Sequence, residues 1–373
     1  MSEWKECQLG DLITFQRGHD LPKTKMQGGK YPVVGSNGII GYHNEYTTEA
    51  PSITIGRSGN VGKPFLFKGR SWSHNTSLYI KEYKAVDPIF IYYFLQTLDL
   101  GNYAGGSAVP TLNRNHIHTL NVYVPTDIDE QRRIGAVLSV IDDKIGLNTA
   151  INENLEQQAQ ALFKAWFVDF ESFGGAMPDD WQDISVYDLA DYINGAAFKK
   201  AEYGDSGLPI IKIAELKSGI TDSTQYCCVR KDDKYYIDDR DILFSWSGNP
   251  DTSIDTFLWS RGKAILNQHT FRVVSKYNAP AFTYFLLKYL KPQFAHIASN
   301  KQTTGLGHVT VADLKRLQFC SNIATINEFE VLAAPIFNTI FAIYKENQHL
   351  AALRDTLLSK LMNGEIDVSA VKI

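Results

Sequence analysis

The sequence lacks several features that would assign it to a membrane, secreted or zinc-binding class. It shows no apolar run of membrane-spanning length, so we expect no membrane partner. Its first residues lack a signal-peptide pattern, which favours a cytoplasmic location. None of its four cysteines forms a Cys-x-x-Cys pair, so neither disulfides nor a cysteine zinc site is expected.

The chain also lacks the strong positive charge that is common in nucleic-acid-binding proteins, since its net charge is −4 at pH 7. The charge is unevenly distributed. Residues 1–126 carry 12 Lys and Arg against 9 Asp and Glu, a net charge of 12 − 9 = +3, whereas residues 127–171 carry 4 against 9, a net charge of 4 − 9 = −5. Residues 177–325 balance at 17 against 17. Local basic loops therefore remain compatible with the overall acidity.

The most informative feature present is a long internal repeat. Trp4 and Trp181 stand 181 − 4 = 177 residues apart, and the same offset relates Gly18 to Gly195. With a drifting offset the repeat continues from residues 58–60 to 247–249, both Ser-Gly-Asn. A colinear series of this length implies two copies of one domain, and hence a bipartite function.

Within each copy, short β-branched and aromatic runs alternate with Gly, Asn and Ser, which is typical of strands joined by turns. Strands are predicted at residues 32–35, 52–56, 65–67, 77–80 and 120–124, and at residues 209–213, 241–245, 264–267 and 270–274. Residues 88–98 and 280–290 are predicted helices with a proline near the first turn. The predicted fold class is α+β.

Each copy is followed by a long helical segment with one apolar stripe. Thr126 is the predicted cap of the first helix, and Thr325 with Glu328 fits a capping box at the second, which Pro335 should kink or interrupt. The stripe residues recur at steps of four and three, as in a coiled coil: Ile134, Leu138, Ile141, Ile145, Leu155, Leu162 and Trp166 in the first helix, and Ile336, Ile340, Ile343, Leu350, Leu357 and Leu361 in the second.

We expect the two helices to pair as an antiparallel coiled coil in a pseudo-twofold molecule, because each can bury the other's stripe. The alternative is that each stripe packs on its own domain. A helix of about 44 residues, at ~1.5 Å per residue, is roughly 65 Å long. It exceeds one ~34 Å turn of B-DNA, so the pair could hold two readers on one face of a duplex. The polar stripe residues Asn148, Asn152 and Asn347 suit selection of register.

The sequence resembles the specificity subunit of type I restriction-modification enzymes. The first helix carries residues 162–170 (LFKAWFVDF), followed by Pro178-x-x-Trp181, and the chain closes on residues 353–366 (LRDTLLSKLMNGEI), both similar to the family's spacer helices. Pro125 with Glu130-Gln131 resembles the family's first helix start. Residues 326–329 (INEF) depart from it, because they lack the Glu-Gln pair.

This resemblance implies two target-recognition domains, residues 1–126 and 174–325, each reading one half of a bipartite site in double-stranded DNA. It implies that the spacer helices, residues 127–173 and 326–373, set the gap between the halves. The same helices would dock two adenine methyltransferase (modification) subunits, through which the restriction (motor-nuclease) subunits would join. On this interpretation the chain has no catalytic residue, metal or cofactor of its own.

Enzymatic alternatives rest on short patterns. Asp205 with Glu215-x-Lys217 has the spacing of a metal-dependent nuclease, but the pattern is absent from the first copy. The glycine-rich residues 56–63 resemble a phosphate loop but fail its consensus, which favours an ordinary turn. His116-x-His118 could share one face of a strand and bind a metal, but no third ligand is evident. A plain protein-interaction adaptor would explain the helices but not the basic loops.

The candidate DNA contacts lie in four loop clusters whose side chains can donate to bases or phosphates. The first copy supplies Arg57, Ser58, Asn60 and Lys63, and then Ser107, Thr111, Asn113 and Arg114. The second copy supplies Ser247 and Asn249, and then Lys301, Gln302, Thr303, Thr304 and His308. For each cluster the alternative is ordinary turn chemistry, because Gly, Asn and Ser favour turns.

We predict that the chain purified alone will neither cleave DNA in Mg²⁺ nor methylate it with S-adenosylmethionine, because no catalytic set occurs with full spacing. Gel-based cleavage and radiolabelled methyl transfer measure the two activities. Mg²⁺-dependent cleavage that Glu215→Gln abolishes would instead establish the nuclease alternative.

Overall fold

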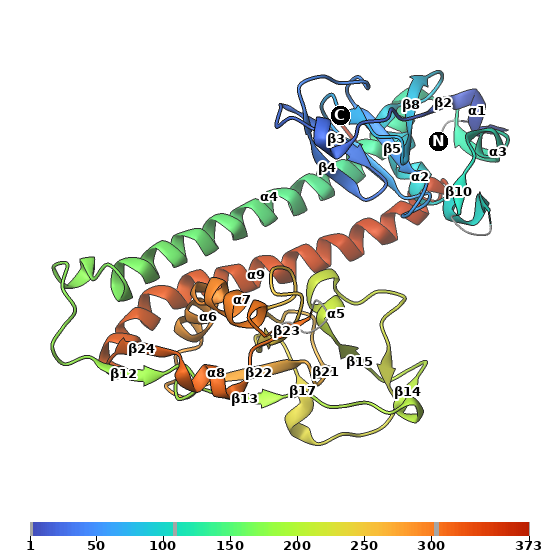
Figure 1. The fold of residues 1–373 in the computed structure, drawn as a ribbon. Helices are drawn as coiled ribbons and strands as arrows, with labels where there is room; N and C mark the ends of the chain where they lie inside the picture. The colour runs from blue at the N-terminus through green and yellow to red at the C-terminus, as the bar shows by residue number, and fades with distance from the viewer. Residues whose placement is uncertain (1–2, 107–109, 302–305, 373) are drawn as a thin grey trace. The chain divides into compact units, whose positions relative to one another are not determined.

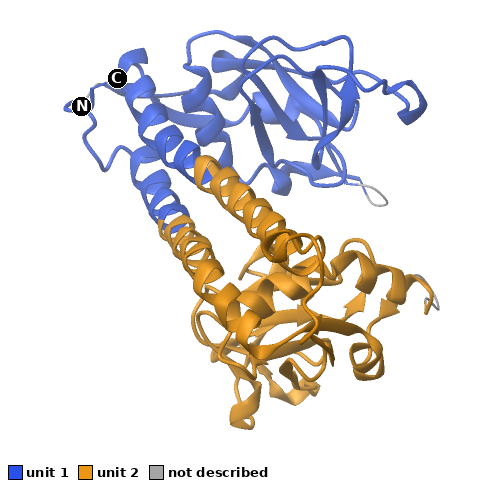
Figure 2. Ribbon diagram, turned by 90° about the vertical axis from the view of Figure 1, so that its left-hand side faces the viewer, with its two compact units in different colours: residues 1–145, 350–373 blue, residues 146–349 orange. Residues whose placement is uncertain are grey.

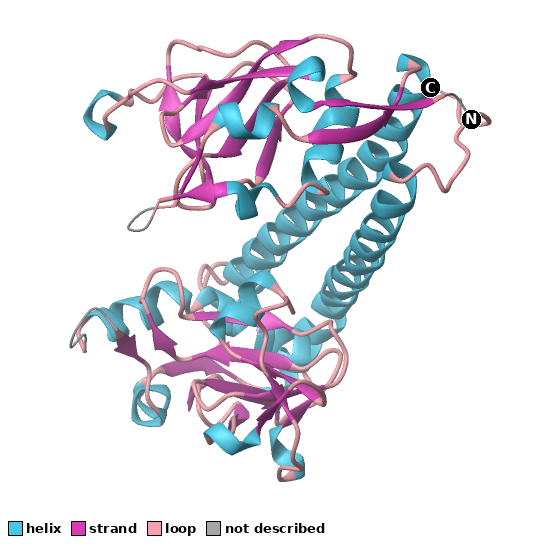
Figure 3. Cartoon of the chain, turned by 90° about the vertical axis from the view of Figure 1, so that its right-hand side faces the viewer, coloured by secondary structure: helices cyan, strands magenta, loops and turns pink. Residues whose placement is uncertain are grey.

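The computed structural model describes residues 3–106, 110–301 and 306–372. The chain divides into two compact units, unit 1 comprising residues 1–145 with 350–373 and unit 2 comprising residues 146–349 (Figure 2). Both units combine mainly antiparallel sheets with short helices (Figure 3), so the predicted α+β class is confirmed.

Unit 1 is built on a four-stranded antiparallel sheet of order β2-β8-β5-β6 and a three-stranded sheet of order β4-β3-β7, in which β3 and β7 are parallel. Its strands are β1 Trp4–Gln8, β2 Ile13–Arg17, β3 Tyr31–Gly35, β4 Gly38–His43, β5 Ser52–Gly56, β6 Pro64–Phe67, β7 Trp72–Ser73, β8 Ser77–Tyr83, β9 Ala104–Gly105, β10 Thr111–Leu112 and β11 Asn121–Pro125 (Figure 1). Its short helices are α1 Leu9–Leu12, α2 Pro88–Gln96 and α3 Arg114–His118.

Unit 2 repeats the four-stranded sheet in the order β13-β22-β18-β20 and carries a five-stranded sheet of order β14-β16-β15-β21-β17. Its strands are β12 Gln182–Ser185, β13 Ala190–Asn194, β14 Tyr203–Gly204, β15 Leu208–Ile211, β16 Tyr226–Cys227, β17 Tyr236–Ile237, β18 Ile242–Ser245, β19 Ser247–Gly248, β20 Asp255–Leu258, β21 Ala264–Leu266, β22 Thr270–Ser275, β23 Gly307–His308 and β24 Gln318–Ser321. Its short helices are α5 Ile213–Ser218, α6 Pro280–Tyr289, α7 Lys291–Ser299 and α8 Val311–Arg316.

The internal repeat survives in the backbone contacts. Gly18 N donates to Ser77 O at 3.0 Å in unit 1, and Gly195 N donates to Thr270 O at 3.0 Å in unit 2. At both glycines a Cβ atom would lie within 2.3 Å of a carbonyl oxygen of the neighbouring chain, so only glycine permits this approach. The sequence repeat is therefore two copies of one fold.

Each predicted strand and helix of the repeated domains is present, with small shifts at the ends. The predicted strand at residues 209–213 ends at Ile211, because Ile213 begins α5, where the Glu215 carboxylate accepts a hydrogen bond from Lys212 N at 3.0 Å. The short helices α1, α3, α5, α7 and α8 were not predicted. Those of four to six residues, α1, α3, α5 and α8, leave too little apolar periodicity to detect.

The long helices are α4 Ile128–Phe167 and α9 Ile323–Met362. Their caps differ from the predicted ones. The Asp127 carboxylate accepts from Asp129 N at 3.0 Å, and Asn322 Oδ1 accepts from Thr325 N at 2.7 Å. Thr126 instead donates to Glu3 O at 2.9 Å. The helices thus begin near the predicted residues, but on caps that the sequence analysis did not choose.

Pro335 does not interrupt α9, which runs through it. By length and composition α9 could cross a membrane, which corrects the expectation that no apolar run is long enough. Its apolar residues have another use, however, because Phe329, Phe337 and Ile340 are buried in the core of unit 2. Packing in unit 2 therefore accounts for part of the apolar character of α9.

Within each unit, the parts of α4 and α9 that belong to it run antiparallel. In unit 2 the buried Asn148 Nδ2 donates to Asn347 Oδ1 and to Glu346 Oε2, both at 2.8 Å, and Asn152 Nδ2 donates to Ile340 O at 3.3 Å. In unit 1 Arg354 Nη1 donates to Asp142 Oδ1 at 2.8 Å. These polar contacts fix one register, because sliding either helix would leave buried amides unpaired.

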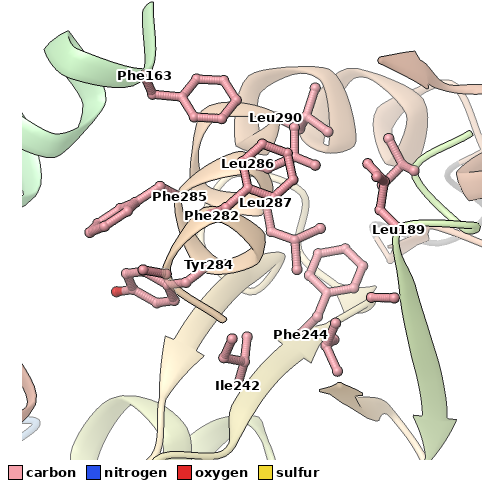
Figure 4. Close-up of a cluster of buried hydrophobic side chains, with 14 of the residues drawn as sticks. Phe163, Leu189, Ile242, Phe244, Phe282, Tyr284, Phe285, Leu286, Leu287 and Leu290 are labelled. Carbon is pink, nitrogen blue, oxygen red and sulfur yellow. The ribbon is translucent and has the colours of Figure 1, made fainter. Parts of the chain in front are cut away.

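The ends of both helices are also core elements. In unit 2 the ring of Phe163 lies within 6.1 Å of those of Phe282, Phe319 and Phe329, and it faces α6 above β18 (Figure 4). In unit 1 Ile134 and Leu138 of α4 join Leu361 of α9 in one core. The predicted stripe residues are all buried or half-buried, but Phe163 and Phe167 lie outside that stripe. The apolar face is wider here than a two-helix seam, because the helix also contacts the domain.

We expect Phe163→Ala to lower the free energy of unfolding by about 3 to 5 kcal/mol, because the fully buried ring would leave a cavity. Leu147→Ala on the same helix is the control. The Leu147 side chain is 58% exposed, so its loss should change stability by less than about 0.5 kcal/mol. Urea unfolding followed by circular dichroism compares the two, and equal losses would contradict the core role of Phe163.

Candidate nucleic-acid interface

In unit 1 the loop after β5 is a tight hairpin turn. Gly56 N donates to Lys63 O at 3.1 Å, and Gly62 N donates back to Gly56 O at 2.8 Å. The glycines therefore close the connection between β5 and β6, and the resemblance to a phosphate loop reflects this turn. The turn presents Arg57 and Ser58 at its start, both half-buried.

The two candidate clusters of unit 1 come together, although the bridged residues Ser58 and Thr111 are 111 − 58 = 53 positions apart in sequence. Ser58 and Thr111 form an antiparallel β-bridge, and Leu112 N donates to Arg57 O at 2.9 Å. Arg57 N donates in turn to Thr76 O at 2.8 Å, so the Arg57 backbone is held from two sides. Ser107 lies outside the described residues.

A cavity of about 390 Å³ opens beside this bridge, and its lining is basic. Its wall consists of Arg17, Arg57, Leu78, Thr111, Leu112, Asn113 and Arg114. Among the described residues, none of the three arginines forms an ion pair within 4.0 Å. Sequence reasoning missed Arg17, whose only signal is its place at the end of β2, directly before Gly18.

The remaining candidates of unit 1 are divided in role. Asn113 caps α3, with Oδ1 accepting from Asn115 N at 3.0 Å, so its carbonyl oxygen has a structural partner. The exposed Lys63 lines a separate cavity of about 410 Å³ with Gly62 and Asn102, away from the arginines. Asn60 is exposed on the turn. The structure therefore brings Arg57, Thr111, Asn113 and Arg114 together and leaves Lys63 aside.

Unit 2 repeats the bridge with different side chains. Ser247 of β19 pairs with His308 of β23, at the positions that Ser58 and Thr111 occupy in unit 1. Val309 N donates to Trp246 O at 2.8 Å, as Leu112 N donates to Arg57 O. The candidate clusters of unit 2 thus also meet on one pair of short strands.

Two candidates of unit 2 have structural partners. Asn249 Oδ1 accepts from the backbone N of Asp251 and of Thr252, each at 3.1 Å, so it orders its own turn. Lys301 Nζ donates to the buried Asp313 carboxylate at 2.5 Å. Burial opposes ionisation there, but the hydrogen bonds from Lys301 and Thr310 hold the pKa of Asp313 below its usual value. Gln302, Thr303 and Thr304 lie outside the described residues.

The structure gives the nuclease pattern no support. The Glu215 carboxylate is buried and caps α5 through Lys212 N, whereas Asp205 and Lys217 are exposed. Within residues 3–106, 110–301 and 306–372, no group of three or more His, Cys, Asp and Glu side chains is placed to hold a metal ion. Glu215 is best explained as a helix cap.

The paired histidines lie on α3, not on a strand as supposed for metal binding. Phe15 N donates to His118 Nε2 at 2.9 Å, so the His118 side chain ties β2 to α3. Burial, with smaller contributions from Lys84 and Arg114, lowers the pKa of His118. His116 is exposed at the helix surface. His118 therefore has a structural role.

Comparison with known proteins places these features in context. The sequence model of the type I restriction modification DNA specificity domain matches residues 1–157 and 178–320. The type I restriction enzyme MjaIX specificity subunit of Methanocaldococcus jannaschii is 26% identical over 305 residues, covering 75% of this chain and 69% of that protein. The HindI specificity subunit of Haemophilus influenzae is 24% identical over 338 residues, covering 69% and 71%.

A solved structure shares the fold. The S subunit of a type I restriction-modification system from M. genitalium superposes with a TM-score of 0.61, at 17% identity, over 96% of this chain and 96% of its own. At this identity the likeness concerns the fold alone.

The lowered pKa of His118 predicts a pH dependence of stability. An unfolded histidine, with a pKa near 6.5, binds a proton more readily than folded His118, so protonation favours unfolding as pH falls below about 6.5. We expect the Tm to drop over this range and the drop to be smaller in His118→Gln, whose amide oxygen accepts from Phe15 N without titrating. The pKa of His74 is also lowered, mainly by burial. Because the wild type and His118→Gln both contain His74, its contribution cancels in the comparison. Identical pH profiles would contradict this role of His118.

Proposed function

Because the chain belongs to the type I restriction-modification DNA specificity family, we propose that each of its two repeats reads one half of a bipartite DNA site. The observation that carries this proposal is the repeated bridge. Ser58 with Thr111, and Ser247 with His308, stand at equivalent places and carry half-buried polar side chains on short paired backbone segments. Such strands suit the major groove, where bases are distinguished by their hydrogen-bonding edges.

The division of the chain follows from the same proposal. Residues 1–126 and 174–325 would be the target-recognition domains, and residues 127–173 and 326–373 the spacer segments that set the gap and carry the partners. The predicted seam residues, from Ile134 to Trp166 and from Ile336 to Leu361, would hold the spacers together. The burial of Ile141 and Ile340 supports this assignment.

We further propose that the chain has no activity alone and acts in a cytoplasmic complex. Two adenine methyltransferase subunits would dock on the spacer helices, and restriction subunits would join through them. Exposed apolar side chains on α4 support docking, since Val140, Leu147 and Ile151 recur at steps of seven and four on one helix face and are 66%, 58% and 38% exposed. Helix α4 therefore offers apolar contact area beyond what its own packing uses.

The test is whether substitutions in the two repeats affect recognition of different halves of the DNA site. Once genomic methylation mapping has defined the site, binding is measured against duplexes scrambled in one half at a time. Arg114→Ala should weaken recognition of one half only, and His308→Ala that of the other. A lost base contact costs about 1 to 3 kcal/mol and relaxes the preference at one position, whereas a lost phosphate contact weakens all sequences alike.

Binding to a fully scrambled duplex is the control, because it reports the sequence-independent part of the affinity. If both variants shift the preference at the same base pairs, the assignment of one reader to each half is wrong.

A further inference from the structure

The arginine cavity of unit 1 is suited to a ligand that presents only hydrogen-bond acceptors. Arg17, Arg57 and Arg114 border it, and guanidinium groups donate but never accept. Leu78 and Leu112 contribute apolar wall, and each is only 2% exposed. Because none of the three arginines is ion-paired among the described residues, their donors remain available. On DNA, the matching acceptors are the guanine O6 and N7 atoms or the phosphate oxygens.

The position of Arg57 favours a base over a phosphate. Its N–H donates to Thr76 O, and its C=O accepts from Leu112 N at 2.9 Å, so the side chain starts from a fixed backbone. A planar guanidinium on a fixed stem makes two parallel hydrogen bonds well, and this is the geometry that a guanine edge requires. A flexible, exposed cation would be sufficient for a phosphate.

The second repeat strengthens this choice. The backbone contacts equate Arg57 with Trp246, and the sequence offsets equate Arg17 with Asn194 and Arg114 with Val311. These three residues of unit 2 are uncharged. Trp246 Nε1 donates to Asn194 Oδ1 at 3.1 Å, so the indole donor already has an acceptor within unit 2. Both halves of a DNA site carry phosphates. If the arginines bound a phosphate, the same contact would be useful in both repeats. The three arginines occur only at the positions in unit 1, which favours a contact with a base.

Resting on the proposed function, we propose that the cavity receives the major-groove edge of a guanine in the half-site that unit 1 reads. O6 and N7 of that guanine accept from Arg57, while Arg17 and Arg114 complete the positive wall. The half-site read by unit 2 has no guanine contact from the equivalent position. The two repeats thus share a backbone frame but read DNA with different chemistry at one corresponding place.

The test uses the full chain assembled with its modification subunits and its mapped DNA site. Each guanine of one half-site is replaced in turn by 7-deazaguanine, which keeps base pairing but lacks the N7 acceptor. We expect one replacement, in the half read by unit 1, to weaken binding by about 5-fold or more, the lower end of the range for a bidentate base contact, because N7 is one of the two acceptors. The matched variant Arg57→Met removes every donor at this position, and Arg57→Lys keeps the charge without the planar fork. Arg57→Met should bind the natural site more weakly than the wild type and show no further loss with 7-deazaguanine.

Two measurements control this result. The salt dependence of Arg57→Lys should equal that of the wild type, because the charge is retained. The Tm of the Arg57 variants should also be unchanged, because the hydrogen bonds of Arg57 with Thr76 and Leu112 involve its backbone.

The proposal is overturned if 7-deazaguanine has no effect at any position of that half-site, or if Arg57→Met remains sensitive to it. It is equally overturned if only methylphosphonate replacement of a phosphate weakens wild-type binding, which would assign the cavity to the backbone. Failure of the proposed function looks different, because the wild-type complex would then bind mapped and scrambled duplexes alike.

Discussion

Each unit depends on apolar residues that reach it from both long helices. The core of unit 1 is completed by the C-terminal end of the chain, where Leu361, Met362 and Val368 are almost fully buried. Gly364, at a φ of +70°, packs against the ring of Trp4, where a Cβ atom would lie 3.2 Å from ring carbons. Unit 1 is therefore closed by residues more than 200 positions beyond its last strand. In unit 2 the burial of apolar side chains likewise brings Phe163 of α4 against Phe329 of α9.

At the two candidate reading sites the backbone contacts are the same, whereas the side chains differ. The backbone bridges that hold the two candidate reading sites are equivalent in both units, from Leu112 N to Arg57 O and from Val309 N to Trp246 O. The side chains on that frame differ, with arginine in one and tryptophan in the other. Backbone hydrogen bonds do not depend on side-chain identity, so specificity can change at these positions without loss of the fold.

Much of the fold could be predicted because its signals are local. The strand at residues 52–56 and the proline-led helix at Pro88 were predicted correctly from β-branched runs and from turn chemistry. The four clusters of candidate contacts were also chosen from local composition, and their role in binding DNA stays a prediction. Caps were harder, because Asp127 and Thr126 are both good caps and only the contact between Thr126 and Glu3 decides between them.

The sequence by itself determined the two-copy organisation, the α+β class and the apolar faces of the long helices. Repeat offsets and side-chain periods depend only on the order of residues in the chain. The tertiary structure alone decided which distant residues meet. It placed Arg17 beside Arg57 and Arg114, gave His118 a partner in Phe15 N, and buried Phe163 in the core of unit 2. Those outcomes depend on packing between segments far apart in sequence, and no local pattern encodes such contacts.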